Sequence, residues 1–379
     1  MATLRVIVDQ LVADVPGGIG RYTTELTRQL IATAPRGCDV EGIVSKISDE
    51  RAAEIRESLP GLADLHRATL PRRELTAAWQ HGVIGSSGNG MVHATSLMAP
   101  LRRHNRAEQL GTQVAVTIHD VVPWTHPDAL TPRGVAWHRA MAKRAAKYAD
   151  AIVVPTHAVA ADLDRYFSFG DRIRVIGGAV SPALKVPVQA SARARALELP
   201  DRYLLAVGTL EPRKGLELLI RALALPQSGD LPLLIAGPQG WGDVDVLQVA
   251  ASAGVDASRV RVLGFLSDSD LALVIERATA FVYPSLAEGF GLPVVEAMSL
   301  GTPVIHANVP ALVEVGAGAT YVIERTTADD YPAQIAEAIE AVTTDAALAE
   351  RLTISGLDRA RSFSWRDSAE KVWQLHADL

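Results

Sequence analysis

Short apolar runs alternate with longer amphipathic stretches along most of this 379-residue chain, in two successive series. A short apolar run is typical of a buried strand, and helical stretches between such runs indicate β–α–β units with parallel strands. The runs of the first series are residues 5–9, 40–44, 90–93, 114–118, 151–154 and 174–176. Those of the second series are residues 203–207, 233–236, 261–263, 280–283, 303–305 and 320–323. The pattern predicts an α/β protein.

A polar, Ala-rich stretch with three prolines, residues 181–200, separates the two series and is the best candidate for a linker. The length of the chain also favours more than one domain. We predict two Rossmann-like domains of similar size, whose parallel sheets face a shared interdomain cleft with the carboxyl ends of their strands. The expected ranges are 1–185 for the N-terminal domain, 186–200 for the linker, 201–362 for the C-terminal domain and 363–379 for a terminal helix.

Composition excludes several classes of protein. The net charge of −6 argues against a nucleic-acid binder, which usually has an excess of Lys and Arg. The single cysteine, Cys38, rules out an internal disulfide framework and a Cys-based zinc finger. No window approaches the ~18 apolar residues of a membrane-spanning helix, and the chain starts with a predicted strand rather than a signal peptide. We expect a cytoplasmic protein, with peripheral contact to the inner face of a membrane as its closest membrane association.

The segment with the most candidate functional groups is residues 288–296, after the apolar run 280–283. It reads Glu-Gly-Phe-Gly-Leu-Pro-Val-Val-Glu. Pro293 suits the first turn of a helix, because its missing N–H is not needed there and its φ is already helical. Glu288 is expected in the loop ahead of this helix, and Glu296 inside it. The simpler interpretation is a strand–turn–helix corner with two surface acids that favour the helix dipole.

A corner of this kind also leaves backbone N–H groups without helical partners. The N–H groups of Phe290, Gly291 and Leu292 would lie at the helix N-terminus, which is a natural site for an anion. The segment therefore combines a candidate anion site with two carboxylates.

Glycine-rich loops follow the first predicted strand of each domain. Residues 17–20 read Gly-Gly-Ile-Gly and would let a ligand approach the backbone, although a structural turn is an equally good explanation. Residues 208–215 read Gly-Thr-Leu-Glu-Pro-Arg-Lys-Gly and place Arg213 and Lys214 at a sheet edge where ligands bind. Arginine binds phosphate oxygens through two parallel hydrogen bonds, and lysine acts as a point charge. The alternative is a solvated basic pair beside Glu211.

Two histidines stand at the ends of predicted strands. His119 follows the buried run 114–118 and precedes Asp120, so its side chain is well placed to meet a ligand. His93 ends the run 90–93 and is a weaker candidate of the same kind. The alternative for either residue is a histidine that is hydrogen-bonded to neighbouring backbone.

Together these motifs resemble the GT-B glycosyltransferases of family 4 over essentially the whole chain. The resemblance is based on residues 17–20, 119–120 and 208–215, on Gly-Trp-Gly at 240–242, on Gly-Phe-Leu at 264–266, and on Glu288 and Glu296, which fit the E-x7-E signature of that family. That signature within Glu-Gly-Phe-Gly-Leu-Pro is highly specific, whereas Gly-Gly-x-Gly is not. Bacterial mannosyltransferases of surface polysaccharides or glycolipids are the subgroup that the chain resembles most.

The resemblance implies roles for the residues on the phosphate side. Gly18 would let the backbone come near the diphosphate and the acceptor. Arg213 and Lys214 would neutralise the leaving nucleoside diphosphate, and the N–H groups of residues 290–292 would assist them. Cations and aligned N–H groups stabilise the negative charge that develops on a diphosphate in the transition state.

The resemblance also implies roles on the sugar side. Glu288 would bind hydroxyls of the donor hexose, Glu296 would bind hydroxyls of the ribose, and His119 would contact the sugar near its reacting centre. Such enzymes are retaining. No residue is an evident nucleophile, unlike the paired carboxylates of retaining glycosidases. We therefore expect front-face attack, in which the leaving phosphate takes the acceptor proton.

GDP-mannose is the expected donor, with a UDP-hexose (glucose or N-acetylglucosamine) as the alternative. The expected acceptor is a saccharide or a polyprenyl- or other lipid-linked saccharide in cell-surface polysaccharide or glycolipid synthesis. No cofactor is expected beyond the nucleotide-sugar donor. A phosphorylase or epimerase of the same fold and a non-enzymatic sugar-binding protein are weaker alternatives.

We expect no metal requirement. A metal-dependent sugar transferase would use an Asp-x-Asp motif, and such tripeptides occur at residues 162–164, 243–245 and 268–270. Tripeptides this short are common by chance in a chain with 43 acidic residues. The first of them also lies on a predicted helix, where alternate residues face apart.

Two further segments are amphipathic. A predicted helix at 137–148 places four cations, Arg139, Lys143, Arg144 and Lys147, on nearly one side. A solvated charged face is the commoner explanation, and docking on anionic lipid headgroups is the alternative. Residues 364–379 form a second such helix, and the resemblance implies that it crosses back to the first domain.

Overall fold

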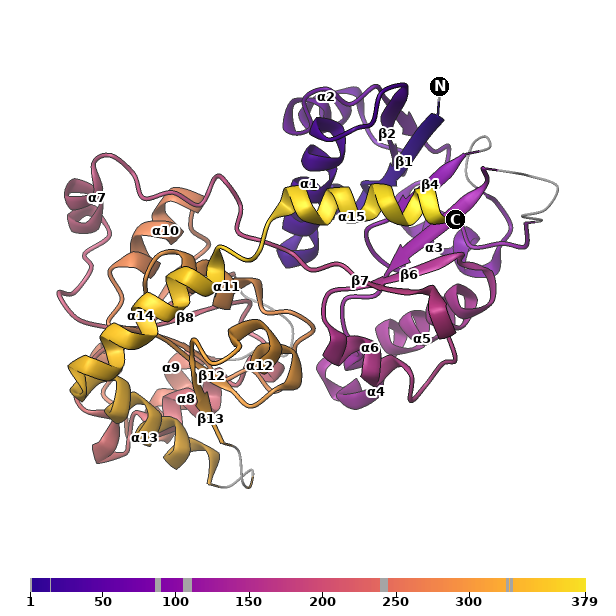
Figure 1. The fold of residues 1–379 in the computed structure, drawn as a ribbon. Coiled ribbons are helices and arrows are strands. Elements are labelled where there is room, and N and C mark those ends of the chain that lie inside the picture. Colours follow the sequence, from indigo (N-terminus) through magenta and orange to yellow (C-terminus); the bar gives the residue numbers. More distant parts are fainter. Residues whose placement is uncertain are drawn as a thin grey trace. The chain divides into compact units, whose positions relative to one another are not determined.

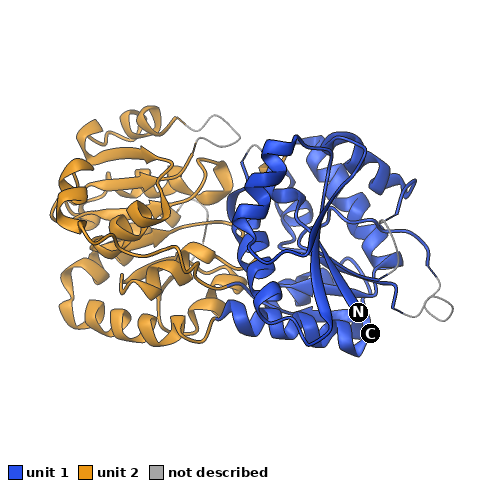
Figure 2. Ribbon diagram, turned by 90° about the horizontal axis from the view of Figure 1, so that it is seen from above, with its two compact units in different colours: residues 1–127, 131–178, 364–379 blue, residues 128–130, 179–363 orange. Residues whose placement is uncertain are grey.

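The computed structural model describes residues 2–13, 15–85, 90–104, 111–238, 245–324, 327 and 330–379. The chain divides into two compact units (Figure 2). Unit 1 comprises Met1–Pro127, Thr131–Gly178 and Ser364–Leu379, and unit 2 comprises Asp128–Leu130 and Ala179–Phe363. The Gly-Trp-Gly motif at 240–242 and Asp243 of one Asp-x-Asp tripeptide lie outside the described residues.

Unit 1 is built on seven parallel strands in the order β3-β2-β1-β4-β5-β6-β7 (Figure 1). The strands are β1 (Ala2–Ile7), β2 (Cys38–Val44), β3 (Asp64–Arg67), β4 (Met91–Ala94), β5 (Gln113–Thr117), β6 (Ala151–Val154) and β7 (Ile173–Val175). The helices are α1 (Gly17–Ala32), α2 (Asp49–Ser58), α3 (Arg72–His81), α4 (Val122–Thr125), α5 (Pro132–Tyr148), α6 (His157–Leu163) and α15 (Trp365–Asp378).

Unit 2 is built on six parallel strands in the order β10-β9-β8-β11-β12-β13. The strands are β8 (Leu204–Val207), β9 (Leu233–Ala236), β10 (Val260–Gly264), β11 (Ala280–Tyr283), β12 (Val304–Ala307) and β13 (Tyr321–Ile323). The helices are α7 (Ala190–Ala196), α8 (Leu216–Ala222), α9 (Val246–Ser252), α10 (Asp268–Glu276), α11 (Leu292–Ser299), α12 (Pro310–Gly316), α13 (Tyr331–Thr344) and α14 (Ala346–Ala360).

The two sheets confirm the predicted α/β fold with two Rossmann-like units. Each apolar run that was predicted to be a strand overlaps an observed strand. The strand that the sequence did not indicate is β3, which reads Asp-Leu-His-Arg at the edge of the unit 1 sheet. Leu65 is the buried residue of this strand, so β3 has no apolar run by which it could be recognised.

Alternate residues of the unit 2 strands enter two different cores, one on each face of the sheet. Leu204 and Ala206 of β8 belong to the core that includes residues of α8 and α13, whereas Leu205 belongs to the core that includes residues of α10 and α11. Successive side chains of a strand point to opposite faces. Because both faces are covered, the strands read as continuous apolar runs rather than as alternating ones.

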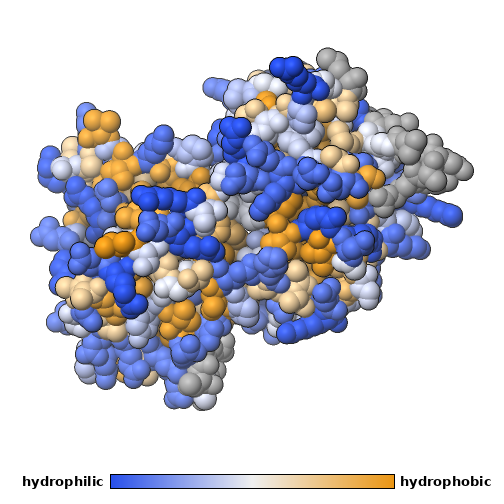
Figure 3. Space-filling model, in the orientation of Figure 1, coloured by the Kyte–Doolittle hydropathy of each residue, from blue (hydrophilic) through white to orange (hydrophobic). Residues whose placement is uncertain are grey.

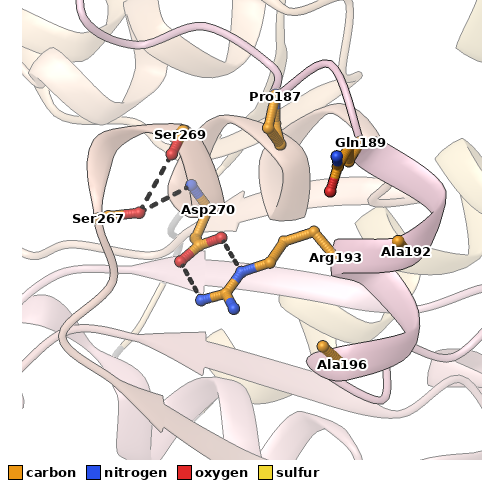
Figure 4. Close-up of a pocket in the computed structure, with 8 residues that line it drawn as sticks. All are labelled: Pro187, Gln189, Ala192, Arg193, Ala196, Ser267, Ser269 and Asp270. Carbon is orange, nitrogen blue, oxygen red and sulfur yellow. Dashed lines mark hydrogen bonds and ion pairs between the residues drawn. The ribbon is translucent and has the colours of Figure 1, made fainter.

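The stretch 186–200 is not the linker that the sequence predicted. It belongs to unit 2 and contains α7, whose Arg193 pairs with Asp270 of α10 through Nε–Oδ1 (2.5 Å) and Nη2–Oδ2 (2.7 Å) contacts (Figure 4). Ala and Arg favour a helix, which outweighs the prolines on either side. Unit 2 already begins at Ala179, ahead of the predicted boundary.

The C-terminal helix α15 packs in unit 1 beside α1. Trp373 Nε1 donates to the backbone oxygen of Leu30 in α1 (3.2 Å). The ring of Trp365 meets the ring of Tyr22 edge-on, with centroids 5.6 Å apart. The chain therefore returns to unit 1 after it has completed unit 2.

Hydrophilic residues cover much of the face in Figure 3, with apolar residues between them. Lys143 and Lys147 of α5 are exposed, but Arg139 and Arg144 of the same helix donate to backbone carbonyls of unit 1. The exposed cationic surface of α5 is therefore smaller than the sequence suggested. None of the described helices is long and apolar enough to cross a bilayer.

Two buried histidines meet where α15 lies against the unit 1 sheet. His93 of β4 is fully buried, and neither of its ring nitrogens has a hydrogen-bond partner. The ring of His376 in α15 is 5.7 Å from that of His93, and His376 Nδ1 is 2.9 Å from Gln113 Oε1. His93 is therefore a core residue and not the ligand contact that its position after a strand suggested.

The stability of the protein should fall in mild acid through His93. Burial lowers its pKa from 6.5 to about 4, because the charged form is disfavoured away from water. Between these values the unfolded chain binds the proton and the folded chain does not. The free energy of unfolding is therefore greatest above pH 6.5 and decreases towards pH 4, by about 3 kcal/mol in total for a shift of this size.

Urea unfolding at about pH 8 and about pH 5 measures this effect, and His93→Val should make the difference between the two pH values smaller by about 2 kcal/mol. The exposed His81 offers a control, since His81→Gln should retain the difference. An unchanged pH dependence in His93→Val would contradict the assignment.

Candidate functional site

The loops that follow β8 and β11 are in close contact in unit 2. After β8, a single 3-10 turn (Pro212–Lys214) leads to Gly215, which has a φ of +67°. A Cβ on Gly215 would lie 2.4 Å from the backbone oxygen of Pro284, so only glycine fits there. The backbone N–H of Leu286 donates to the oxygen of Arg213 (2.8 Å), which joins the two loops directly.

The contact between these loops brings together three residues that the sequence singled out separately. Oε1 of Glu288 accepts hydrogen bonds from Lys214 Nζ (2.6 Å), Ser285 Oγ (2.7 Å), Tyr283 OH (2.8 Å) and Arg213 Nη1 (3.3 Å). All four bonds end on the same oxygen, and the Glu288 side chain is only 10% exposed. We call Glu288, Lys214 and Arg213 the carboxylate cluster.

The two cations keep Glu288 ionised despite its burial. Burial raises the pKa of Glu288, but the charges of Lys214 and Arg213 and the hydrogen bonds to the carboxylate outweigh it and hold the pKa at about 2. Burial lowers the pKa of Lys214, which the charge of Glu288 opposes. Arg213 also pairs with Glu211 (Nη2–Oε1, 2.9 Å). Each cation of the cluster therefore has an acidic partner.

The remaining unit 2 candidates surround the start of α11. Gly291 caps the helix with a φ of +85°, and a Cβ on it would lie 2.4 Å from Leu312 Cδ2. Helical hydrogen bonding begins with Val294 N to Gly291 O, so the N–H groups of Phe290, Gly291 and Leu292 precede it, as predicted. Glu296 lies inside α11 and is 3% exposed, so it is a buried acid and not a surface one.

In unit 1, the glycine-rich loop is the beginning of α1. Gly17 has a φ of +57°, and a Cβ on Gly20 would lie 2.3 Å from Cβ of Pro16, so both positions require glycine for the local structure. A Cβ on Gly18 would meet no atom within 4 Å, and Gly18 is exposed. The local structure therefore gives no reason for a glycine at Gly18, which is the one predicted to face a ligand.

His119 lies after β5 with one ring nitrogen fixed. Its Nε2 is 2.8 Å from the backbone oxygen of Thr95, and since a carbonyl only accepts, Nε2 must donate. Burial lowers the pKa of His119, against the opposing effects of this hydrogen bond and of Asp120. The ring is therefore neutral at pH 7, with Nδ1 as an acceptor. The Tyr22 ring packs edge-on against it, with centroids 4.9 Å apart.

His119 lines a pocket of about 360 Å³ within unit 1. Asp120, which follows it in the sequence, also lines this pocket, and so do four residues that the sequence did not single out, Gln10, Arg72, Trp124 and Trp137. Gln10 lies in the 3-10 turn Asp9–Val12 just after β1, a position that could have marked it. Arg72 begins α3 and Trp137 lies in α5, both far from His119 in the sequence. Trp124 lies in α4, shortly after His119, but no motif marked it.

None of the Asp-x-Asp tripeptides forms a metal site in the described part of the chain, where no three His, Cys, Asp or Glu side chains gather. Asp270 belongs instead to the ion pair with Arg193. That pair lines a shallow hollow of unit 2 together with Ser267 and Ser269 (Figure 4).

Comparison with known proteins gives consistent matches over both units. A model described as "Glycosyl transferases group 1" matches residues 189–356, and one described as "Glycosyltransferase Family 4" matches residues 16–184. The chain is 29% identical over 373 residues to O-antigen chain mannosyltransferase B of Escherichia coli, covering 92% of this chain and 93% of the relative. It is also 29% identical over 391 residues to D-inositol 3-phosphate glycosyltransferase 1 of Catenulispora acidiphila, covering 95% and 90%.

Among solved structures, sucrose-phosphate synthase from Thermosynechococcus elongatus has a TM-score of 0.76 at 22% identity, and the match covers 100% of this chain and 99% of that one. This likeness shows the GT-B fold.

The close approach of the two loops in unit 2 can be tested at Gly215. Gly215→Ala must adopt a left-handed conformation and also clashes with Pro284, whereas Gly254→Ala, just after the end of α9, has a similar φ (+74°) with no atom within 4 Å of the added Cβ. Both variants should lose about 1–2 kcal/mol of unfolding free energy for the backbone conformation. Overpacking should cost Gly215→Ala about 1–3 kcal/mol more, as measured by urea unfolding. Equal losses in the two variants would contradict the clash with Pro284.

Proposed function

Because this chain belongs to family 4 of the GT-B glycosyltransferases, we propose that it transfers mannose from GDP-mannose to a saccharide or lipid-linked acceptor with retention of configuration. The observation that carries the proposal is the carboxylate cluster beside the start of α11. Two cations, a carboxylate and the N–H groups ahead of a helix occur together at the carboxyl end of the unit 2 sheet. This is the place where ligands bind in such sheets.

In the proposed reaction the donor diphosphate is bound by Arg213, Lys214 and the N–H groups of residues 290–292. Cleavage of the bond between the sugar and the diphosphate leaves positive charge on the sugar and additional negative charge on the phosphate. Fixed cations and N–H dipoles stabilise that phosphate without reorganising during the reaction. The acceptor hydroxyl attacks from the side of the leaving group, and its proton passes to the leaving phosphate.

Glu288 acts in this scheme as a hydrogen-bond acceptor for sugar hydroxyls. A carboxylate whose pKa is about 2 is a poor proton acceptor at neutral pH. Its Oε1 already accepts four hydrogen bonds, which reduces the nucleophilicity of the group. These properties support front-face attack over a covalent glycosyl-enzyme. A sugar trapped covalently on Glu288 or Asp120 would contradict this part of the proposal.

Other residues keep the roles that the resemblance implies. In this proposal Glu296 binds the ribose hydroxyls, Gly18 allows the diphosphate and the acceptor to approach the backbone of α1, and His119 binds the sugar near its reacting carbon through the unprotonated Nδ1. A UDP-hexose is the alternative donor, since nothing in the described site selects the base.

The proposed setting is cell-surface polysaccharide or glycolipid synthesis in the cytoplasm. The E. coli relative supports a saccharide acceptor through its name, O-antigen chain mannosyltransferase B. Peripheral contact with the inner membrane face would rest on Lys143 and Lys147. In a liposome flotation assay, such contact requires that the protein floats with anionic liposomes but not with neutral ones.

Thermal unfolding in the presence of nucleotide sugars tests the donor. GDP-mannose should raise the unfolding temperature more than UDP-glucose, dTDP- or ADP-sugars, because a ligand stabilises the folded state by RT ln(1 + [L]/Kd), about 2.7 kcal/mol at 100 times its Kd. The shift should be the same with EDTA, since we propose no metal requirement. A larger shift with UDP-sugars would replace the donor assignment, and loss of the shift and of activity in EDTA, restored by Mg²⁺ or Mn²⁺, would contradict metal independence.

Separate substitutions of the two glutamates distinguish their roles. Glu288→Ala should reduce kcat by about 100-fold, since it removes contacts near the reacting centre. Glu296→Ala should chiefly raise the donor KM, by about 10-fold for one lost hydrogen bond to a charged group. Glu217→Ala, at an exposed position of α8, is the control and should retain both constants. Equal and minor effects of both active-site variants would count against these roles.

A further inference from the structure

The pocket of unit 1 combines aromatic walls with a few polar groups, which is the chemistry of a small-molecule site. Its volume of about 360 Å³ falls in the usual range of about 300–1,000 Å³ for such sites. Trp124 and Trp137 line it, and Trp124 is held in place by a stacked Tyr166 (5.4 Å between centroids) and an edge-on Phe167 (5.6 Å). Rigid indole rings of this kind offer flat apolar surfaces to a ligand.

The polar groups of the pocket suit hydroxyls. His119 contributes an unprotonated Nδ1, because its Nε2 is used by Thr95, and the proposed function gives this Nδ1 to the donor sugar. Asp120 uses Oδ1 to accept the N–H of Val122 (3.0 Å) and carries a negative charge on the pocket wall. Both are acceptors, and a sugar hydroxyl can donate to either.

The charges of the pocket do not suit a phosphate. Among the described residues that line the pocket, the acidic or basic side chains of the types Arg, Lys, Asp and Glu are those of Arg72 and Asp120. Arg72 is already committed, because its Nε donates to Oδ2 of Asp9 (2.7 Å), a carboxylate that is 1% exposed. A buried carboxylate needs its cation, so the charge of Arg72 is balanced by Asp9. Asp120 then leaves the pocket with negative charge, which repels an anion.

We infer that Trp124, Trp137 and Asp120 select the acceptor, so that this pocket takes an uncharged pyranoside ring stacked on the indoles and rejects a phosphorylated one. The inference is based on the proposed function and goes beyond it by naming the acceptor class. It separates the chain from its relatives named for D-inositol 3-phosphate and groups it with the O-antigen mannosyltransferase.

The test compares methyl α-mannoside and α-mannobiose with mannose 6-phosphate and D-inositol 3-phosphate as acceptors, with the donor fixed by the thermal-unfolding series. The neutral glycosides should be used at least 10-fold more efficiently. Trp124→Ala and Trp137→Ala should raise the acceptor KM at least 10-fold and leave the donor KM unchanged. Ile354→Ala, at a position of α14 in unit 2 that is 55% exposed, is the control and should change neither constant.

Charge selection is tested at Asp120. Asp120→Asn can still accept the Val122 N–H, so the local turn is retained while the charge is removed. The variant should use the phosphorylated acceptors about 10-fold better relative to the neutral ones, and the exposed Asp171→Asn should not. Preference of the wild-type protein for phosphorylated acceptors, or unchanged acceptor KM values in both tryptophan variants, would overturn the inference.

Direct binding separates this inference from the proposed function. Saturation-transfer NMR with methyl α-mannoside reports on the pocket without a reaction. Binding that is reduced in Trp124→Ala supports the inference even if no donor is turned over, which would itself overturn the proposed function. Donor turnover without glycoside binding would overturn the inference alone.

Discussion

One carboxylate oxygen, Oε1 of Glu288, links the loops on which the unit 2 site depends. A buried carboxylate loses its hydration, and this cost is offset only when cations and hydrogen-bond donors replace the lost water. Lys214 and Arg213 come from the loop after β8, whereas Tyr283 ends β11 and Ser285 lies in the loop that follows, before Glu288. The bonds from Lys214 and Arg213 therefore fix the two loops beside each other, with the start of α11 directly after Glu288.

Unit 1 has a similar buried carboxylate after its first strand. Asp9 follows β1, is almost fully buried and accepts bonds from Ser45 N and Arg72 Nε, both of 2.7 Å. In both units a buried acid at the carboxyl end of the sheet is held by a basic residue from another segment. In unit 2 the cations lie where we propose the donor phosphates to bind. In unit 1 the charge of Arg72 is balanced by Asp9, and Asp120 adds a negative charge to the pocket, which is why we infer an uncharged ligand there.

The sequence predicted those features that a local pattern can express. The strands were recognised because a parallel sheet covered on both faces requires continuous apolar runs, and β3 was missed because Leu65 is its one buried residue. The stretch 186–200 was interpreted as a linker from its prolines, but α7 forms there and Arg193 ties it to Asp270. Composition cannot report an ion pair between segments that are far apart in the chain.

For the candidate site, the sequence identified the residues, because they all lie at strand ends or helix starts. They are Glu288, Glu296, Arg213, Lys214, Gly18 and His119. The sequence did not predict how these residues are arranged relative to one another within each unit. Two surface acids were the simpler interpretation of the sequence, whereas the fold buries Glu296 and places both cations on one oxygen of Glu288. Arg72 and Trp137 become neighbours of His119 only in three dimensions. The order of strands and loops along the chain can be predicted from short stretches of sequence. Which side chains pair, which are buried and how their charges balance depend on packing between segments that are distant in the sequence.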